Sequence, residues 1–596
     1  MATTILLNGK IATMGKRAPF VSALALKDGR VLAAGEAQDA LAHQEAGSRV
    51  IDLGGRTVVP GLNDSHLHII REGLNYNLEL RWDGVPSLAI ALDMLRRQAE
   101  RTPPGQWVRV VGGWSAYQFE ERRLPTLDEI NEALPDTPAF ILHLYDRAFI
   151  NRAGLCALGL DKQTPDMPGG TFERDAEGNP TGLVLATPAA TILYATLAKI
   201  PKLTPEQQRN STRQFLRELN RFGITSAIDA GGGAQNYPDD YAVCRELARE
   251  GLLTVRIAYY LFAQNAQHEF EDFSRWVDMT HPGQNDDMFK PNGFVTEGGG
   301  ENLVWAAADF ENFVQPRPEL PPTMEAELTR VMRLLVSKRW PFRIHATYDE
   351  SIGRDLDVFE AINKEIPFNG LRWFIDHAET VSARNLARIK ALGGGIAIQN
   401  RMAFQGEDFI ARYGKEAASH APPIQAMREM GIPLGAGTDA TRVASYNPWL
   451  SLHWLVTGKT LGGTELYPAS NRLDRMEALR LYTEGSAWFS HEEEVKGRLE
   501  PGCFADLCVL TEDYFTVSED AIKGIESVLT LVAGEVVHAA GPFAAYAPEP
   551  LPVMPEWSPV AVFGGYYAAD RTRRPGPVTM LGEQEMPQAS RPKADD

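Results

Sequence analysis

Two histidines in the first part of the chain have the spacing of a metal-binding pair. His66 and His68 are separated by one residue and follow the apolar run Val58–Leu62 closely. Residues two apart on a β-strand point to the same side, so both imidazoles can reach one cation. Because this spacing also arises by chance in loops, the pair indicates a metal site only if further ligands join it.

Three more candidate ligands stand in the second half of the chain. His345, His377 and Asp439 each lie at or just after the end of a short apolar run. Taken singly, each could be a hydrogen-bonded polar residue at the end of a strand. Together with the first pair they make four imidazoles and one carboxylate, a ligand set that suits Zn²⁺ or another divalent first-row metal.

The segments that must position these residues alternate between helix and strand. The clearest unit is a helix over residues 204–222, which Thr204 can cap, followed by the apolar run Ile224–Asp229. The same order recurs downstream: helices are predicted over 323–340, 349–364, 382–392 and 423–430, and strands over 342–346, 373–377, 395–399 and 433–438. Such repetition indicates a parallel sheet.

These units predict an α/β fold with a (β/α)8 TIM barrel over residues 58–486. Catalytic residues of such barrels lie at the carboxyl ends of the strands, where the histidines and Asp439 are expected. An open, doubly wound sheet is the alternative architecture. It would normally carry a glycine-rich phosphate loop, and none of the three Gly-Gly-Gly clusters has that spacing.

Both ends of the chain contain short strand-like runs separated by turns. Asn8-Gly9 and Asp28-Gly29 are turn signals in the first 57 residues, and Ala533-Gly534 is one near the other end. We expect segments 1–57 and 487–547 to form one small β-sandwich domain. Residues 548–596 are expected to be a C-terminal extension whose middle docks on the protein and whose end frays.

The composition limits the class of protein. Of the 596 residues, 44% are hydrophobic and 23% charged, and the formal net charge is −19. These values are typical of a soluble globular protein with a small-molecule substrate, and they argue against nucleic-acid or membrane partners. Four scattered cysteines, with no signal peptide or long apolar run, predict a cytoplasmic protein; a homo-oligomer is compatible with all of this.

The motifs around the candidate ligands resemble those of the amidohydrolase superfamily, in particular its branch of large enzymes that includes YtcJ-like proteins and N-substituted formamide deformylases. The matching segments cover Val58–His68, Gly112-Gly113-Trp114, Gly223–Ser226, His345-Ala346 with Asp349, Asp376–Ala378, Gly437–Asp439 and Lys496–Leu507. The resemblance implies the same barrel, interrupted by an insertion over about residues 75–201.

The resemblance also implies roles for the site residues. His66 and His68 would hold a metal together with Asp439, which would act as general base and then as general acid. His345 and His377 would bind a second metal, or bind the first and polarise the substrate. Hydrolysis of an amide at neutral pH needs a water with its pKa lowered toward ~7, a polarised carbonyl, and a carboxylate that carries the proton to the leaving nitrogen.

The sequence departs from the family at the fourth barrel strand. Binuclear members carry a carboxylated lysine there, but Gly293 or Val295 falls at that position, and Lys290 precedes a proline and stands too early. Glu297 could serve as the bridging carboxylate instead, or it could be a loop acid that accepts hydrogen bonds from nearby backbone N–H groups. Without a bridging lysine we expect one divalent metal per chain, most simply Zn²⁺, rather than two.

These observations predict a metal-dependent hydrolase that cleaves an amide-like C–N bond of a small organic molecule through metal-activated water. A deaminase on the same scaffold is one alternative, although Tyr348, Asp349 and Glu350 stand where its proton-donating glutamate is expected. A barrel that binds a ligand or regulates without hydrolysis is another. Most aromatic residues of the insertion are expected to form a small core, and Trp114 is the candidate for substrate contact.

Overall fold

Eight parallel strands form one nearly closed sheet in the computed structural model, which describes residues 2–16, 18–167, 169–187, 190–283, 293–310 and 312–569. In chain order the strands are β8 (Leu62–Leu67), β14 (Ile224–Asp229), β15 (Arg256–Leu261), β16 (Phe294–Gly299), β17 (Phe342–Ala346), β18 (Trp373–His377), β19 (Gly395–Gln399) and β20 (Leu434–Gly437). The first and last strands meet through the backbone N–H of Asp439, which donates to the carbonyl of His66 at 2.8 Å. The predicted α/β barrel is confirmed.

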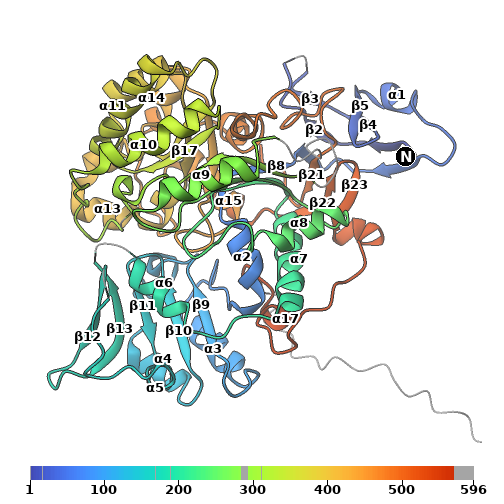
Figure 1. Ribbon diagram of the computed structural model, residues 1–596. Helices are drawn as coiled ribbons and strands as arrows, with labels where there is room; N and C mark the ends of the chain where they lie inside the picture. Colours follow the sequence, from blue (N-terminus) through green and yellow to red (C-terminus); the bar gives the residue numbers. More distant parts are fainter. Residues whose placement is uncertain are drawn as a thin grey trace, which may run out of the picture.

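Helices surround the barrel (Figure 1). They include α7 (Pro205–Arg221), α8 (Ala242–Arg249), α9 (Glu269–Met279), α10 (Met324–Ser337), α11 (Asp349–Glu365), α12 (Ala383–Ala391), α13 (Arg401–Ala418), α14 (Ile424–Glu429) and α15 (Pro448–Thr457). Helix α7 begins as its sequence predicts, because the side chains of Thr204 and Gln207 cap each other's backbone N–H groups. Among the described residues, no helix is long and apolar enough to cross a membrane.

Both ends of the chain build a β-sandwich beside the barrel. One sheet has the strand order β23-β22-β21-β7-β2-β3 and the other β5-β4-β1-β6. Their bounds are β1 (Thr4–Leu7), β2 (Lys10–Ala12), β3 (Phe20–Val21), β4 (Ala23–Lys27), β5 (Arg30–Gly35), β6 (Arg49–Asp52), β7 (Thr57–Pro60), β21 (Leu507–Leu510), β22 (Ser527–Val532) and β23 (Glu535–Ala539). Antiparallel pairing of β7 with β21 joins the two ends, and one apolar cluster includes residues of both sheets.

The insertion between β8 and β14 forms a separate layer, seen below the barrel in Figure 1. Its sheet has the order β12-β13-β11-β10-β9 and carries short helices. The elements are α2 (Ile69–Asn75), α3 (Leu88–Ala99), β9 (Val108–Val111), α4 (Leu127–Ala133), β10 (Ala139–His143), β11 (Arg147–Ile150), α5 (Arg152–Leu158), β12 (Gly170–Arg174), β13 (Pro180–Ala186) and α6 (Thr191–Leu197). Trp107, Trp114 and Phe119 lie in its apolar clusters, so most of its aromatic residues form a core.

The C-terminal extension packs across the barrel and the insertion. Gln98 of α3 donates to the carbonyl of Trp557, and Asn210 of α7 donates to that of Pro552, both at 2.8 Å. The short helix α17 (Val560–Phe563) follows, and Phe563 is buried. The middle of the extension therefore docks, whereas residues 570–596, where fraying is expected, lie outside the described residues.

A buried ion pair connects the barrel to the sandwich. Arg256, the first residue of β15, donates to both carboxylate oxygens of Asp506, at 2.7 and 3.2 Å. The side chains are 4% and 5% exposed, and Asp506 also accepts the backbone N–H of Ala533 at 2.7 Å. Arg256 is therefore fixed by its barrel strand, and Asp506, which directly precedes β21, is fixed by its hydrogen bond to the backbone of the sandwich.

We expect Asp506→Asn to lower the free energy of unfolding by about 3–5 kcal/mol, because it removes the carboxylate that pairs with the buried guanidinium of Arg256. Thermal and denaturant-induced unfolding, followed by tryptophan fluorescence, measure this change. The matched control is Glu365→Gln, which removes the partner of Arg333 in an ion pair whose side chains are both 51% exposed. Its unfolding midpoint should stay at the parent value, and equal loss in both variants would contradict the assigned role of Asp506.

Candidate metal centre

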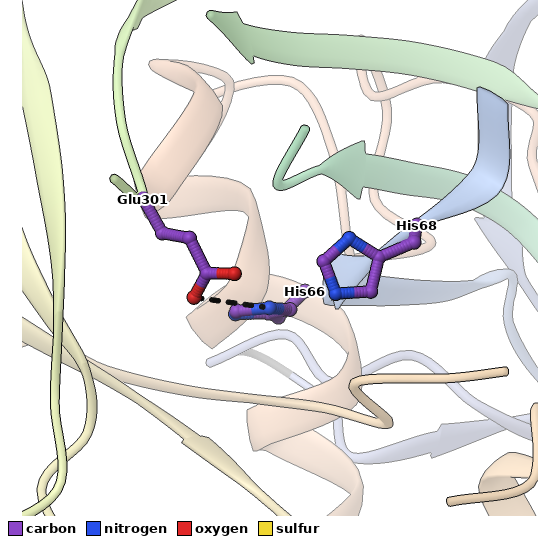
Figure 2. Close-up of side chains that lie close together, drawn as sticks. All are labelled: His66, His68 and Glu301. Carbon is purple, nitrogen blue, oxygen red and sulfur yellow. Dashed lines mark ion pairs between the residues drawn. The ribbon is translucent and has the colours of Figure 1, made fainter. Parts of the chain in front are cut away.

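Six buried side chains converge inside the barrel at the carboxyl ends of its strands. Each is at most 7% exposed, and they are His66, His68, Glu301, His345, His377 and Asp439. The structure thus brings together the five residues that the sequence singled out and adds Glu301. Figure 2 shows Glu301 facing His66, with His68 beside them.

Glu301 lies at the centre of this cluster. Its Oε2 atom is 3.7 Å from His66 Nε2. The same oxygen is 3.4 Å from both His345 Nδ1 and His377 Nε2. Glu301 Oε2, His66 Nε2 and His345 Nδ1 are buried without a hydrogen-bond partner among the described residues. Buried polar atoms are costly when left unpaired. Nitrogen and oxygen atoms that face one another without forming hydrogen bonds are suitable ligands for a metal between them.

Asp439 closes the opposite side of the cluster. Its Oδ1 atom is 3.1 Å from His68 Nε2 and 3.4 Å from His66 Nε2. Three overlapping groups have ligand atoms within 4.8 Å of one another, namely His66, His68 and Glu301, then His66, His377 and Asp439, and then Glu301, His345 and His377. Nitrogen and carboxylate ligands in this number suit a divalent metal.

The electrostatics of the cluster favour a cation. Burial and the charge of Arg343 lower the pKa of His66, but the surrounding carboxylates prevail and raise it to about 10. Burial opposes ionisation of Glu301 and Asp439, yet the neighbouring imidazoles hold the pKa of both carboxyls well below the usual range. A site that holds a proton this tightly through its negative potential also attracts a divalent ion.

Carboxylates behind the ligands set the orientation of two rings. His66 Nδ1 is 3.0 Å from Asp376 Oδ1, and Arg343 Nε donates to the other oxygen of Asp376 at 2.7 Å. His345 Nε2 is 3.1 Å from Asp309 Oδ1. In each ring one nitrogen is engaged by these groups, with Arg343 Nη2 also 2.6 Å from His66 Nδ1, so the opposite nitrogen is left to coordinate a metal. Asp376 and Asp309 therefore turn His66 Nε2 and His345 Nδ1 toward the centre.

Glu297, the candidate bridging residue, lies away from the centre. Its Oε2 atom is 3.2 Å from His491 Nδ1, and it belongs to none of the three ligand groups. Counting residues from the strand ends could have identified Glu301 instead. His377 is the last residue of β18, His68 stands one residue beyond β8, and Asp439 stands two residues beyond β20. Glu301 stands two residues beyond β16, whereas Glu297 is inside that strand. Lys290 lies outside the described residues.

A cavity of about 270 Å³ opens from the metal centre. One wall is formed by five of the six cluster side chains. Five aromatic residues also line the cavity, namely Tyr145, Tyr194, Phe262, Trp305 and Phe310. Trp114 is not in this wall: it is fully buried against Trp82, with ring centroids 4.9 Å apart, and donates to the carbonyl of Leu142 at 2.9 Å. The insertion reaches the cavity through Tyr145 and Tyr194 instead.

The chain belongs to the amidohydrolase family, whose family model matches residues 49–538. It is 23% identical to the N-substituted formamide deformylase of Arthrobacter pascens over 551 residues, covering 90% of this chain and 98% of that protein. It is 26% identical to the putative amidohydrolase YtcJ of Bacillus subtilis (strain 168), covering 82% of this chain and 90% of that one.

A solved structure has the same fold. The crystal structure of an uncharacterized metal-dependent hydrolase from Pyrococcus horikoshii OT3 superposes with a TM-score of 0.61 at 24% identity, covering 87% of this chain and 99% of that one. Family membership and the buried ligand cluster together define the protein as a metal-dependent hydrolase.

Glu297 makes the stability of the fold sensitive to pH. Burial, partly offset by a hydrogen bond from His491, raises the pKa of Glu297 from about 4.5 to about 7. The folded protein then holds a proton that the unfolded chain has released, so stability falls as pH rises from 4.5 through 7. Glu297→Gln removes this loss.

We expect Glu297→Gln to be stabilised relative to the parent at pH 8 by an amount on the order of 1–3 kcal/mol more than at pH 5. Thermal unfolding midpoints of both proteins at the two pH values measure the difference. The same difference at both pH values would show that Glu297 is ionised throughout the range.

Proposed function

We propose that this hydrolase cleaves the C–N bond of an amide of a small organic molecule. The proposal depends on the position of Asp439, an ionised carboxylate that lies beside the ligand histidines and lines the cavity. Amide hydrolysis needs such a group, because a proton must pass from the attacking water to the leaving nitrogen. The aromatic wall supports a substrate with an apolar substituent.

The residues of the chain divide the work of this reaction. A bound divalent metal would lower the pKa of water toward ~7 and polarise a carbonyl group. Asp439 accepts the proton of the attacking water and then donates it to the amine. His377, whose Nε2 is 3.4 Å from Glu301 and whose Nδ1 is 3.9 Å from Asp439 Oδ2, fixes both carboxylates and faces the substrate.

Zinc is the metal that we propose, because the donors are imidazole nitrogens and carboxylate oxygens. The single-metal prediction rested on the lack of a bridging anion at the fourth strand. Glu301 provides a carboxylate there, between His66 on one side and the His345–His377 pair on the other. This arrangement favours two metals over one, since the shared negative charge reduces the repulsion between cations.

The residues that follow His345 favour acyl hydrolysis over deamination. A deaminase would need an acid close after this residue that faces the substrate. Asp349 instead accepts the backbone N–H of Ser382 at 2.7 Å, and Glu350 pairs with Arg317 at 2.9 Å. Neither side chain lines the cavity. The name of the Arthrobacter relative refers to N-substituted formamides, which are therefore the first substrates to test.

The cavity and the net charge also bear on the binding partners of the protein. A cavity of this size fits a small-molecule substrate, and the net charge of −19 disfavours nucleic acid and anionic membranes. We propose a cytoplasmic enzyme, since its cysteines are free. A homo-oligomer is compatible with this proposal.

We expect the parent to retain two metals per chain after extensive dialysis and Glu301→Gln to retain one, because an amide cannot supply the bridging charge. Elemental analysis gives both numbers. The matched control is Glu297→Gln, the same substitution four residues earlier on the chain, which should keep the parent content. One metal in all three proteins would restore the mononuclear interpretation, with His66, His68 and Asp439 as its core.

We expect Asp439→Asn to reduce kcat by roughly 10²–10⁴-fold on any amide that the parent hydrolyses, because it removes the proton carrier. The measurement is release of amine from a panel of formamides, N-acyl amino acids, carbamates and cyclic amides. Metal content is determined in parallel, and Glu297→Gln serves as the control with near-parent turnover. A variant with normal kcat would exclude Asp439 from the mechanism.

A further inference from the structure

The cavity contains a buried arginine without a carboxylate partner. Arg71 of α2 stands three residues after His68, is 5% exposed and lines the cavity. Its Nη1 atom donates to the hydroxyl of Tyr194 at 3.2 Å, and its Nη2 atom has no hydrogen-bond partner among the described residues. No ion pair joins Arg71 to any acid in the described part of the chain. Such a charge is costly to bury unless something pairs with it.

Several other buried arginines of the barrel and insertion have a carboxylate partner. Arg81 donates to Asp83 at 2.8 Å, and Arg343 donates to Asp376 at 2.7 Å. Arg401, which lines the same cavity as Arg71, has Glu379 3.2 Å away. Arg109 and Arg442 are also buried without an ion pair among the described residues, but of these three arginines only Arg71 lines the cavity. A bound anion can therefore supply the counter-charge of Arg71.

Two tyrosines hold the guanidinium of Arg71 without neutralising it. The Tyr194 ring is close to both Arg71 and Arg442, whose Cζ atoms are 5.7 and 4.5 Å from its centroid. Its hydroxyl is hydrogen-bonded to that of Tyr145. Burial raises the pKa of Tyr194, but the two arginines outweigh it and lower the pKa below the ordinary value. The wall therefore has a positive potential that favours an anion.

Arg71 is adjacent to the metal centre. A Cβ atom on Gly232, which has a φ of +154°, would lie 2.8 Å from Arg71 Nη1 and 3.2 Å from His68 Nδ1. The guanidinium and the ligand imidazole thus flank the same backbone position, which glycine leaves open. An anionic group bound by Arg71 would therefore lie close to a substrate bond that is cleaved at the metal centre.

We propose that Arg71 binds a carboxylate of the substrate and that the substrates are N-formyl or N-acyl amino acids with an apolar side chain. In these compounds the carboxylate is two bonds from the scissile nitrogen, and the side chain can occupy the wall formed by Phe262, Trp305 and Phe310. This inference rests on the proposed amide hydrolysis. Water adds to the acyl carbon, the C–N bond breaks, and the nitrogen takes a proton, giving formate or another carboxylate and a free amino acid.

The first test compares two substrates of the parent enzyme. N-Formylphenylalanine carries the carboxylate, and N-formyl-2-phenylethylamine is the same molecule without it. We expect kcat/KM to be about 10–100-fold higher for the anionic compound, the effect of one charge-assisted hydrogen-bonded pair. Equal rates, or a preference for the neutral amide, would overturn the inference and leave amide hydrolysis intact. Hydrolysis of neither compound, nor of any amide in the panel, would count against the proposed function.

The second test measures binding and does not require turnover. Calorimetric titration with 3-phenylpropanoate and with neutral 3-phenylpropanamide is carried out on the parent, Arg71→Met, Arg71→Lys and Arg401→Met, with metal content confirmed by elemental analysis. We expect Arg71→Met to weaken the propanoate about 10–100-fold and the amide little. Arg71→Lys should recover part of the loss, and Arg401→Met should change the affinity for the two ligands by the same factor.

Equal effects of Arg71→Met on both ligands, or no effect on the propanoate, would overturn the assignment of Arg71. A larger selective loss in Arg401→Met would overturn it as well, because the anion would then lie on the other side of the cavity. If Arg71→Met does not fold, the two titrations of the parent decide: a preference for the propanoate supports a carboxylate site, and equal affinity contradicts it.

Discussion

Two buried carboxylates, Glu301 and Asp439, determine how the centre of the barrel is arranged. Each would be too costly to bury alone, and each is compensated by imidazoles that arrive from other strands. Glu301 stands just after the fourth strand and Asp439 just after the eighth, while His66 on the first strand contacts both. The charges are balanced only when the barrel closes, so the site and the fold depend on the same contacts between the first strand and the last.

The sequence predicted what local patterns determine. β14, β17, β18 and β19 have the expected bounds residue for residue, because each is an apolar run between turn signals. It did not predict Glu301, because the end of the fourth strand was not located: Glu297 lies inside β16, and Glu301 stands two residues beyond it. Trp114 shows the same limit: a large aromatic residue is predicted to be buried, but its burial in the core rather than in the cavity wall depends on tertiary packing.

Chemistry and recognition come from different parts of the chain. The ligands stand on barrel strands or within two residues of their ends, and the backbone of these strands is fixed by hydrogen bonds to neighbours on both sides. Tyr145 and Tyr194, which face Arg71, come from the insertion. The insertion can therefore change the shape and charge of the cavity without disturbing the metal ligands.

The pairing of β7 with β21 has a consequence for synthesis of the protein. Pro60 lies opposite Leu507, so the first strands of the sandwich leave the ribosome about 450 residues before their partners exist. At about 5–20 residues per second this delay is about 20–90 s. During this time β7 presents an unpaired edge, a surface that invites association with other nascent strands. The architecture that joins the two ends thus creates a period of aggregation risk before translation is complete.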